Sequence, residues 1–264
     1  IDLVFLNWIE DIPDKRGGLI QLFFFLMIWR RLKSRRVRIV WTMHNKLSHY
    51  QSRMRWKRYL FRFLVRRSDL ILTHSSDGIR YASDFGISGQ ENRVRYFPHP
   101  LTQRLLQFED PASYDILIWG SIIPYKNIDK FLKYLQGQGL ETRYRILLAG
   151  KVKPQEYAAM IEPYCNENII LDDRYIPEEE LIPMISRSRV VVFTHAGDSV
   201  LSSGVLMDSL SYGATVIGPD VAAFSDAGRE GVIQTFRSFG ELVEILDREL
   251  HSPRRNINNL EQFI

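Results

Sequence analysis

The sequence predicts an α/β protein built from two doubly wound, Rossmann-like parallel-sheet domains that face a cleft. Short apolar runs rich in β-branched and aromatic residues alternate with longer segments of helical periodicity along most of the chain. The alternation is interrupted by a polar stretch that follows Pro98, His99 and Pro100, and the balance of charge changes near the same place. Alternating strands and helices favour parallel sheets with helices on both faces.

The first part of the chain contains four predicted strands. They are the compact apolar runs at residues 3–6, 37–43, 70–73 and 94–97. Helical periodicity lies between them, at residues 19–34, 53–67 and 76–85. We expect this part, residues 1–108, to form a first domain.

The alternation resumes after the polar stretch, which contains Glu109, Asp110 and Pro111. Strands are predicted at residues 115–119, 144–149, 169–171, 190–194, 215–217 and 232–235. Helices are predicted at residues 126–136, 154–164, 178–187, 203–212, 221–228 and 238–250. We therefore expect a second domain at residues 109–264. One open sheet of about ten strands is the alternative, and the proline-rich junction argues against it.

The net charge of +4 conceals an asymmetry. Residues 1–105 carry 20 Lys and Arg against 8 Asp and Glu, whereas the rest of the chain carries 15 against 23. The first part is therefore strongly basic and the second acidic, which indicates different electrostatic roles.

The lone cysteine, Cys165, has no partner for an internal disulfide, and no Cys/His cluster suggests structural zinc. These features favour a cytoplasmic location. The longest apolar run, residues 19–29, is shorter than the ~20 residues that span a bilayer. We expect no membrane span.

The stretch LSSGVLMDSLSYGATVIGPD, residues 201–220, places Ser202, Ser203 and Gly204 where a helix begins. The first backbone N–H groups of a helix lack partners inside the helix, and its dipole adds about half a positive charge there. Small residues leave such an end accessible to a phosphate. An ordinary serine N-cap is the structural alternative.

The stretch GSIIPYKN, residues 120–127, directly follows a predicted strand. Its proline restricts the turn, and Lys126 arrives at the start of the next predicted helix, where an ammonium group can meet an anion. An ordinary surface lysine is the alternative.

Other common ligand motifs are absent from the sequence. It contains no GxGxxG fingerprint, Walker A loop or HExxH sequence, so dinucleotide oxidoreductases, P-loop NTPases and zinc proteases have no support. Asp172 and Asp173 are adjacent and do not form a DxD motif.

Residues 115–235 resemble the nucleotide-sugar-binding domain of GT-B glycosyltransferases of the retaining family 4 type. The resemblance is carried by GSIIPYKNIDKFL, YRILLAGK, NIILDDRYIPEEELIPMISRSRVVVFTH and SSGVLMDSLSYGATVIGPD. It extends more weakly through DLVFLNW, RIVWTMHN, DLILTHS and VRYFPHP of the first domain. The resemblance implies that residues 1–108 are the acceptor-side domain without its first β/α unit, and that residues 109–264 are the donor-binding domain.

The resemblance implies a seat for the donor diphosphate. Lys126 would contact the phosphates as a catalytic cation, and backbone amides at the helix start would hold them. The implied phosphate-side residues are Gly120, Ser121, Lys126, Ser202, Ser203, Gly204 and Val205. Because Lys126 and the helix would neutralise the leaving group, the resemblance implies no metal and no cofactor beyond the nucleotide-sugar co-substrate.

The resemblance also implies contacts to the rest of the donor. Asp208 would bind the ribose hydroxyls, and the loop of Arg174, Tyr175 and Ile176 would embrace the base. His44, which follows the predicted strand RIVWTM, would face the donor sugar as a catalytic-site residue; a hydrogen-bonded loop histidine is the alternative.

Two positions depart from the family pattern. Members often carry a Glu-x7-Glu pair, but Val200 stands where the first acid would precede Asp208, and Asp198 is out of register. Members also often carry an arginine where Ser121 stands. A subset with a Ser-Gly helix start also lacks the first Glu.

The basic first domain suggests a membrane surface. Residues 19–38 combine LIQLFFFLMIW with a cluster of bases, and residues 53–67 read RMRWKRYLFRFLVRR. Apolar faces with basic rims suit peripheral attachment to an anionic bilayer at the inner membrane face. A buried helix face with a solvated rim is the alternative. No nucleic-acid motif accompanies the bases, so no nucleic-acid partner is expected.

The resemblance thus implies a retaining, metal-independent glycosyltransferase that transfers a sugar from a nucleotide-sugar donor to a glycan or lipid-linked acceptor in bacterial surface polysaccharide synthesis. Two alternatives remain open. One is a truncated or degenerate GT-B protein that binds nucleotide without turnover. The other is a nucleotide-sugar epimerase, which needs carboxylates at the sugar that the sequence does not identify.

Overall fold

The computed structural model describes residues 2–46, 53–85, 93–102, 104, 106–109, 111–195, 201 and 203–252. The chain divides into two compact units, Ile1–His99 with Asp198–Ser202 and Pro100–Gly197 with Ser203–Ile264. Each unit has its own parallel sheet, of four strands in the first and six in the second. A single sheet of about ten strands, the alternative considered from the sequence, is not formed. The domain limits at 1–108 and 109–264 stay a prediction.

The sheet of the first unit has the strand order β1-β2-β3-β4. Its strands are β1 (Leu3–Asn7), β2 (Arg38–Met43), β3 (Leu70–Thr73) and β4 (Val94–Tyr96). All pairs are parallel, with Asn7 beside Thr42 and Met43 beside Thr73. The residues that follow the strands therefore gather at one edge of this sheet.

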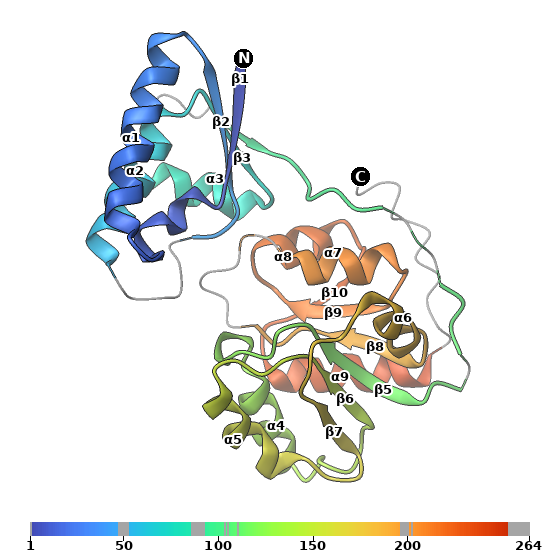
Figure 1. Ribbon diagram of the computed structural model, residues 1–264. Helices are drawn as coiled ribbons and strands as arrows, with labels where there is room; N and C mark the ends of the chain where they lie inside the picture. The colour runs from blue at the N-terminus through green and yellow to red at the C-terminus, as the bar shows by residue number, and fades with distance from the viewer. Residues whose placement is uncertain are drawn as a thin grey trace. The chain divides into compact units, whose positions relative to one another are not determined.

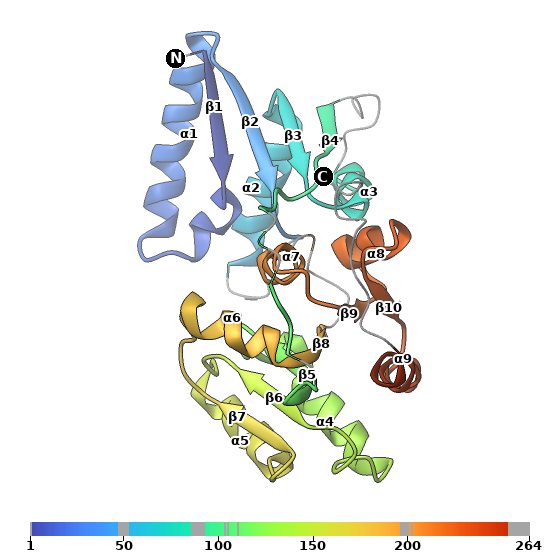
Figure 2. The same ribbon diagram turned by 90° about the vertical axis from the view of Figure 1, so that its right-hand side faces the viewer.

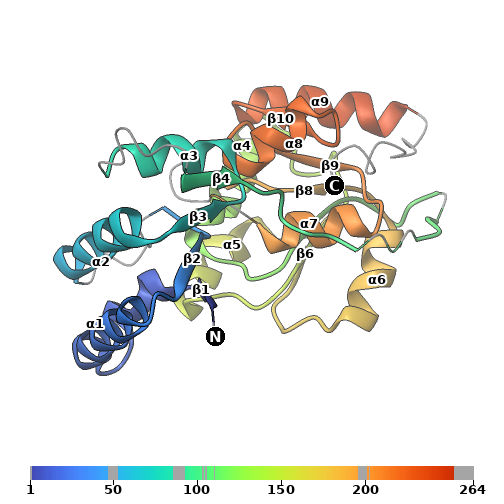
Figure 3. The same ribbon diagram turned by 90° about the horizontal axis from the view of Figure 1, so that it is seen from above.

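Helices of the first unit cover the apolar side of its sheet. They are η1 (Ile9–Asp14, a 3-10 helix), α1 (Gly18–Ser34), α2 (Met54–Arg67) and α3 (Ser76–Ser83). Helices α1 and α2 lie on the same face of the sheet (Figure 1 and, from above, Figure 3). Trp41 of β2 and Phe61 of α2 are fully buried and pack edge to face, with ring centroids 5.1 Å apart.

The sheet of the second unit has the strand order β10-β9-β8-β5-β6-β7. Its strands are β5 (Tyr114–Trp119), β6 (Ile146–Ala149), β7 (Ile169–Asp172), β8 (Ser188–Val192), β9 (Val216–Pro219) and β10 (Gln234–Phe236). Every neighbouring pair is parallel. The strands are almost continuously apolar because both faces of the sheet are covered.

Helices cover both faces of this second sheet. On one face lie α4 (Ile128–Gly137), α5 (Ala158–Ile161) and α9 (Phe239–His251). On the other lie α6 (Glu178–Ser186), α7 (Gly204–Ser211) and α8 (Ala222–Arg229). Figure 2 shows the two layers on either side of the strands. The predicted class of a doubly wound parallel α/β protein is confirmed.

Three local predictions differ from the structure. The helix predicted at 154–164 is broken into η4 (Gln155–Tyr157), α5 and η5 (Glu162–Tyr164), since Pro163 cannot continue a regular helix. Lys126 ends a short 3-10 turn, η3 (Pro124–Lys126), instead of opening α4. The turn η1 was not predicted.

The described helices include none that is long and apolar enough to cross a membrane.

Candidate active site

The carboxyl ends of β5 and β8 form the topological switch point of the second sheet. From these two neighbouring strands the chain proceeds in opposite directions, to β6 and β7 on one side and to β9 and β10 on the other. In open parallel sheets ligands bind in the crevice outside such a point. The turn that begins at Gly120 follows β5, and α7 is the next helix after β8 among the described residues. Both segments that the sequence singled out are therefore placed at the switch point.

Two glycines allow the chain to turn tightly after β5. Gly120 has a φ of +86°, in the left-handed region that favours glycine. A Cβ atom on Gly150, which follows β6, would lie 2.0 Å from the carbonyl oxygen of Gly120, so only a glycine permits this approach. A Cβ atom on Gly120 would lie 3.1 Å from Cγ2 of Val205 and 3.3 Å from Nζ of Lys126. Gly120, Lys126 and Val205 therefore meet at one point.

Lys126 is a buried cation. Its side chain is 5% exposed, and Nζ donates a hydrogen bond to the carbonyl oxygen of Trp119 at 3.1 Å. Burial alone lowers the pKa of the Lys126 ammonium to about 8, and within the described part of the chain no carboxylate is paired with it. The ammonium is therefore short of solvation and of a counter-charge, a state that a bound anion would relieve.

Helix α7 presents its amino end at the same place. Ser203 caps the helix, and its Oγ accepts a hydrogen bond from the amide of Leu206 at 3.2 Å. Gly204 opens the helix, and a Cβ atom there would meet no heavy atom within 4 Å. Space is therefore open beside the first backbone N–H groups. Ser202 lies outside the described residues.

Hydrogen bonds fix α7 to the end of β5. The indole Nε1 of Trp119 donates to Oγ of Ser209 at 2.9 Å, and Oγ of Ser209 donates to the carbonyl oxygen of Val205 at 2.8 Å. Thr194 Oγ1, after β8, donates to the carbonyl oxygen of Lys126. The lysine and the helix end are thus held by one polar network. Such a pair of positive groups suits a phosphate or diphosphate.

Solved structures with the same fold cover nearly the whole chain. The Anabaena protein Alr3699/HepE, in complex with UDP and glucose, matches 99% of this chain and 72% of its own, with a TM-score of 0.71 and 13% identity. The apo form of the lipopolysaccharide outer core galactosyltransferase WaaB matches 99% and 71%, with a TM-score of 0.65 and 14% identity. Both are GT-B proteins. The chain has the GT-B fold.

A third GT-B structure, OtsA in its apo form, matches 99% of this chain and 68% of its own at 13% identity, with a TM-score of 0.68. No protein-family profile matches the sequence, and no curated protein matches it. The fold-level prediction of a GT-B protein is therefore confirmed by structure, at an identity where sequence comparison alone finds nothing.

The other residues that the GT-B resemblance assigns to the second domain differ in their exposure and in their contacts. Ser121 and Asp208 are exposed, and Asp208 lies on the second turn of α7. Arg174 pairs with Asp172, from Nε to Oδ1 at 2.9 Å, and with Glu180, from Nη1 to Oε1 at 3.0 Å.

The loop around Arg174 leaves one aromatic ring open to solvent. Tyr175 is 79% exposed, whereas Ile176 packs against the core. The guanidinium of Arg174 is occupied by carboxylates in this structure, so its ion pairs hold the shape of the loop and leave Tyr175 as the accessible surface.

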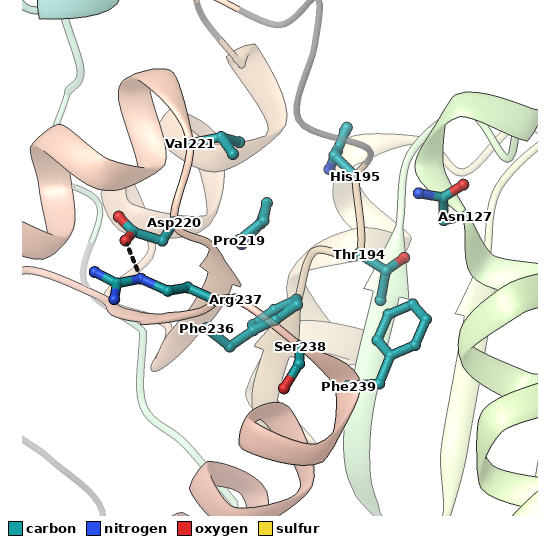
Figure 4. A pocket seen from close by; sticks show the side chains of 10 residues that line it. All are labelled: Asn127, Thr194, His195, Pro219, Asp220, Val221, Phe236, Arg237, Ser238 and Phe239. Carbon is teal, nitrogen blue, oxygen red and sulfur yellow. Dashed lines mark hydrogen bonds and ion pairs between the residues drawn. The ribbon is translucent and has the colours of Figure 1, made fainter.

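A cavity of about 400 Å³ adjoins the switch point. It is formed by the segments after β8, β9 and β10 and by the start of α4, as Figure 4 shows. Asp220 and Arg237 form an ion pair in its wall, from Oδ2 to Nε at 2.9 Å. His195 and Asn127 contribute polar groups. No sequence pattern indicated this cavity, although the strand ends that supply its residues were predicted.

His44 belongs to a cluster of rings in the first unit. It follows β2, stacks on the indole of Trp8 with centroids 4.2 Å apart, and its Nε2 lies 3.2 Å from Oδ1 of Asn7. The ring of His74 lies 5.3 Å from that of His44 and 4.9 Å from that of His99. The histidine partners were missed because only the register of β2, β3 and β4 brings them together.

The electrostatics of this cluster favour neutral imidazoles. Burial and the neighbouring His74 and His99 lower the pKa of His44 to about 4, and burial lowers the pKa of His74. The imidazole of His44 is therefore neutral at pH 7 and exchanges hydrogen bonds as a neutral group. Among the described residues, no group of three or more His, Cys, Asp or Glu side chains is arranged to hold a metal ion.

Glu10 is a buried acid in η1, two residues after Trp8. It is 6% exposed, and its Oε2 accepts a hydrogen bond from the indole of Trp41 at 3.3 Å. Burial raises the pKa of the Glu10 carboxyl to about 7. Sequence reasoning missed Glu10, because a single acid in a short polar turn gives no signal of burial.

Proposed function

We propose that the chain is a nucleotide-sugar-dependent glycosyltransferase that transfers a sugar, with retention and without a metal, to a glycan or lipid-linked acceptor. The observation that carries the proposal is Lys126, which is buried beside the amino end of α7 and has no carboxylate partner among the residues that the structure describes. The complexes of HepE with UDP and with UDP-glucose support a nucleotide-sugar donor.

The proposed chemistry is leaving-group stabilisation. The bond between the anomeric carbon and the diphosphate oxygen breaks, and the acceptor oxygen bonds to the same carbon on the same face. The proton of the acceptor hydroxyl passes to the departing phosphate oxygen. Lys126 and the amides of Ser203, Gly204 and Val205 hold the charge that grows on the diphosphate, so the protein itself supplies the positive charge the step requires.

The remaining donor contacts are proposals as well. Asp208 on α7 is assigned to the ribose hydroxyls and the exposed ring of Tyr175, with Arg174 and Ile176, to the base. Gly120 and Ser121 border the phosphates. His44, as a neutral imidazole, is assigned to a sugar hydroxyl.

The first experiment is a thermal-stability screen with UDP, GDP, ADP, CMP and dTDP. A ligand that binds only the native state raises stability by mass action. We expect one diphosphate to raise the melting temperature, and the rise to vanish in Lys126→Met. If no nucleotide raises it, the donor site is wrong.

Nucleotide binding without turnover is the second candidate, and exposed Ser121 favours it, because an uncharged residue stands where a second phosphate-binding cation often does. Donor hydrolysis assays on a chain that binds nucleotide separate the two. Release of nucleoside diphosphate from UDP-sugars, stimulated by an acceptor, supports transfer; binding with no release supports the second candidate.

We further propose that α1 attaches the protein to an anionic bilayer. Six large apolar side chains of α1 are 40 to 66% exposed: Leu19, Ile20, Phe23, Phe24, Met27 and Ile28. Arg30, Arg31 and Lys33 follow them on the same helix. Sedimentation with phosphatidylglycerol vesicles should capture the protein, and Phe23→Ser with Phe24→Ser should release it. Equal capture of both proteins would contradict the proposal.

A further inference from the structure

The cluster around Trp8 has the features of a binding surface. Trp8 directly follows β1, at the carboxyl edge of the sheet of the first unit, and 52% of its side chain is exposed. The indole is nearly parallel to the imidazole of His44, with an interplanar angle of 5°. Because His44 covers one face of the indole and half of the side chain is still exposed, the other face is open to a ligand.

The backbone holds Trp8 in an uncommon conformation. Its φ of 58° and ψ of 22° lie in the left-handed region, which bulky residues rarely adopt. A glycine or asparagine would fit there with less strain. Such outliers persist where the surrounding structure imposes them and concentrate at ligand sites.

The groups behind the indole indicate the charge of the ligand. Nε2 of His44 is held by Oδ1 of Asn7 at 3.2 Å, and Nδ1 of the buried His74 lies 2.9 Å from the carbonyl oxygen of Phe97. The low pKa of His44 leaves the imidazole that backs the indole uncharged at pH 7. An open aromatic face carries partial negative charge and attracts the C–H groups of a ligand ring. An exposed aromatic face backed by an uncharged imidazole fits an uncharged ring whose C–H groups lie on its faces and whose hydroxyl groups lie at its rim, which describes a pyranose.

We propose that Trp8 is the stacking platform for a pyranose ring of the acceptor, so that the acceptor is a saccharide at the end that reacts. The inference rests on the proposed function and specifies its acceptor. His44 supports the indole from behind, and Asn7 holds His44 through the contact at 3.2 Å. Trp8 thus binds the acceptor, while Asn7 acts as a positioning residue.

The test is direct binding of neutral sugars, measured separately from donor binding. The full chain is titrated with the methyl glycosides of glucose, galactose, mannose and N-acetylglucosamine, and with maltose and lactose. Ligand-observed saturation-transfer NMR reads which ring protons touch the protein. We expect at least one sugar to bind, with the strongest transfer to protons on one face of its ring.

Three variants make the test specific to the indole. Trp8→Gly removes the ring and suits the left-handed backbone, so it should fold and weaken sugar binding at least about tenfold. Trp8→Phe keeps an aromatic face and should bind within about threefold of the parent. Tyr59→Ala removes an aromatic side chain of similar exposure, 48%, from α2 and should have no effect.

The outcomes separate this inference from the proposed function. If none of the sugars binds, or if Trp8→Gly binds them as the parent does, the platform is wrong. A titration of the same proteins with UDP reports on the donor site alone. UDP binding that is unchanged in Trp8→Gly while sugar binding is lost supports both proposals, whereas loss of both ligands in that variant would show a general disturbance and contradict a dedicated platform.

Discussion

The Nζ atom of Lys126 lies 3.1 Å from the carbonyl oxygen of Trp119, so a buried ammonium donates to a neutral backbone oxygen at the end of β5. A neutral oxygen solvates an ammonium less well than water does, which is why the pKa of Lys126 falls to about 8. A diphosphate would restore the missing negative charge. The buried charge therefore lowers the stability of the ligand-free protein, and a bound anion would remove this penalty.

Replacing this lysine should separate binding from folding. Lys126→Met retains the length of the side chain and removes the charge. We expect the Kd for the nucleoside diphosphate to rise at least about tenfold, since a charge-assisted hydrogen bond is lost. Unfolding without ligand should change little, because relief of the buried charge offsets the lost bond to Trp119. Calorimetric titration and thermal melts measure both. Lys153→Ala, which removes an exposed lysine, is the control; an equal loss of affinity there would remove Lys126 from the site.

Nucleotide affinity should fall in alkaline solution. The anion favours the charged ammonium, so the pKa of Lys126 is higher in the complex than the value of about 8 in the free protein. At a pH between these two pKa values, Lys126 is deprotonated in the free protein and protonated in the complex, so binding takes up a proton. The Kd for the diphosphate should therefore rise by up to about tenfold per pH unit above pH 8. Lys126→Met should lack this slope, and an identical slope in the variant would assign the titration elsewhere.

Gly204→Val should obstruct the amino end of α7 without harming the fold. A Cβ atom at Gly204 meets no heavy atom within 4 Å, so the side chain occupies the space assigned to the phosphate. We expect an unchanged melting temperature and a Kd at least about tenfold higher for the diphosphate. Gly137→Ala in α4, where a Cβ atom also meets nothing within 4 Å, should leave binding intact. Normal binding by Gly204→Val would place the phosphate elsewhere.

Glu10 should make the protein less stable as the pH rises. Its pKa is about 7 in the folded state against 4.5 for the ordinary value, so the folded state binds the extra proton between these limits. The stabilisation is complete below pH 4.5 and is lost as the pH rises through 7. At 1.36 kcal/mol per pH unit the loss is about 3 kcal/mol. Urea unfolding from pH 4.5 to 8 should show it, and Glu10→Gln should abolish it; a slope that persists in the variant would come from other groups.

Much of the architecture could be predicted because strand signals are local. Each strand of a parallel sheet that is covered on both faces is a short, nearly continuous apolar run, which can be recognised in the sequence without knowledge of its neighbours. Two local details depend on single residues and could not be predicted from periodicity over a whole segment. They are the break at Pro163 and the left-handed backbone of Asn127, which separates Lys126 from α4. Lys126 itself stood out because a lysine after a glycine turn is a recognisable pattern.

The contacts of the site residues were harder to predict from the sequence. His44 could be singled out, but its contacts with Trp8 and His74 depend on the pairing register of separate strands. The burial of Glu10 and the Asp220–Arg237 pair in the cavity wall likewise arise from packing between distant segments. Sequence patterns indicate which strand ends carry chemistry, whereas the distances between their side chains require the fold.

The hydrogen bond from the indole of Trp119 to Ser209 makes the indole N–H an intrinsic NMR probe of the site. Trp119 is only 8% exposed, so its indole N–H proton should exchange slowly with solvent and give a resolved resonance. Ser209 in turn bonds to Val205, within the first turn of α7. A ligand that binds at that turn should alter the hydrogen bond of the indole. The chemical shift of the indole N–H would then report the fraction of protein with ligand bound, without a label or an assay of turnover.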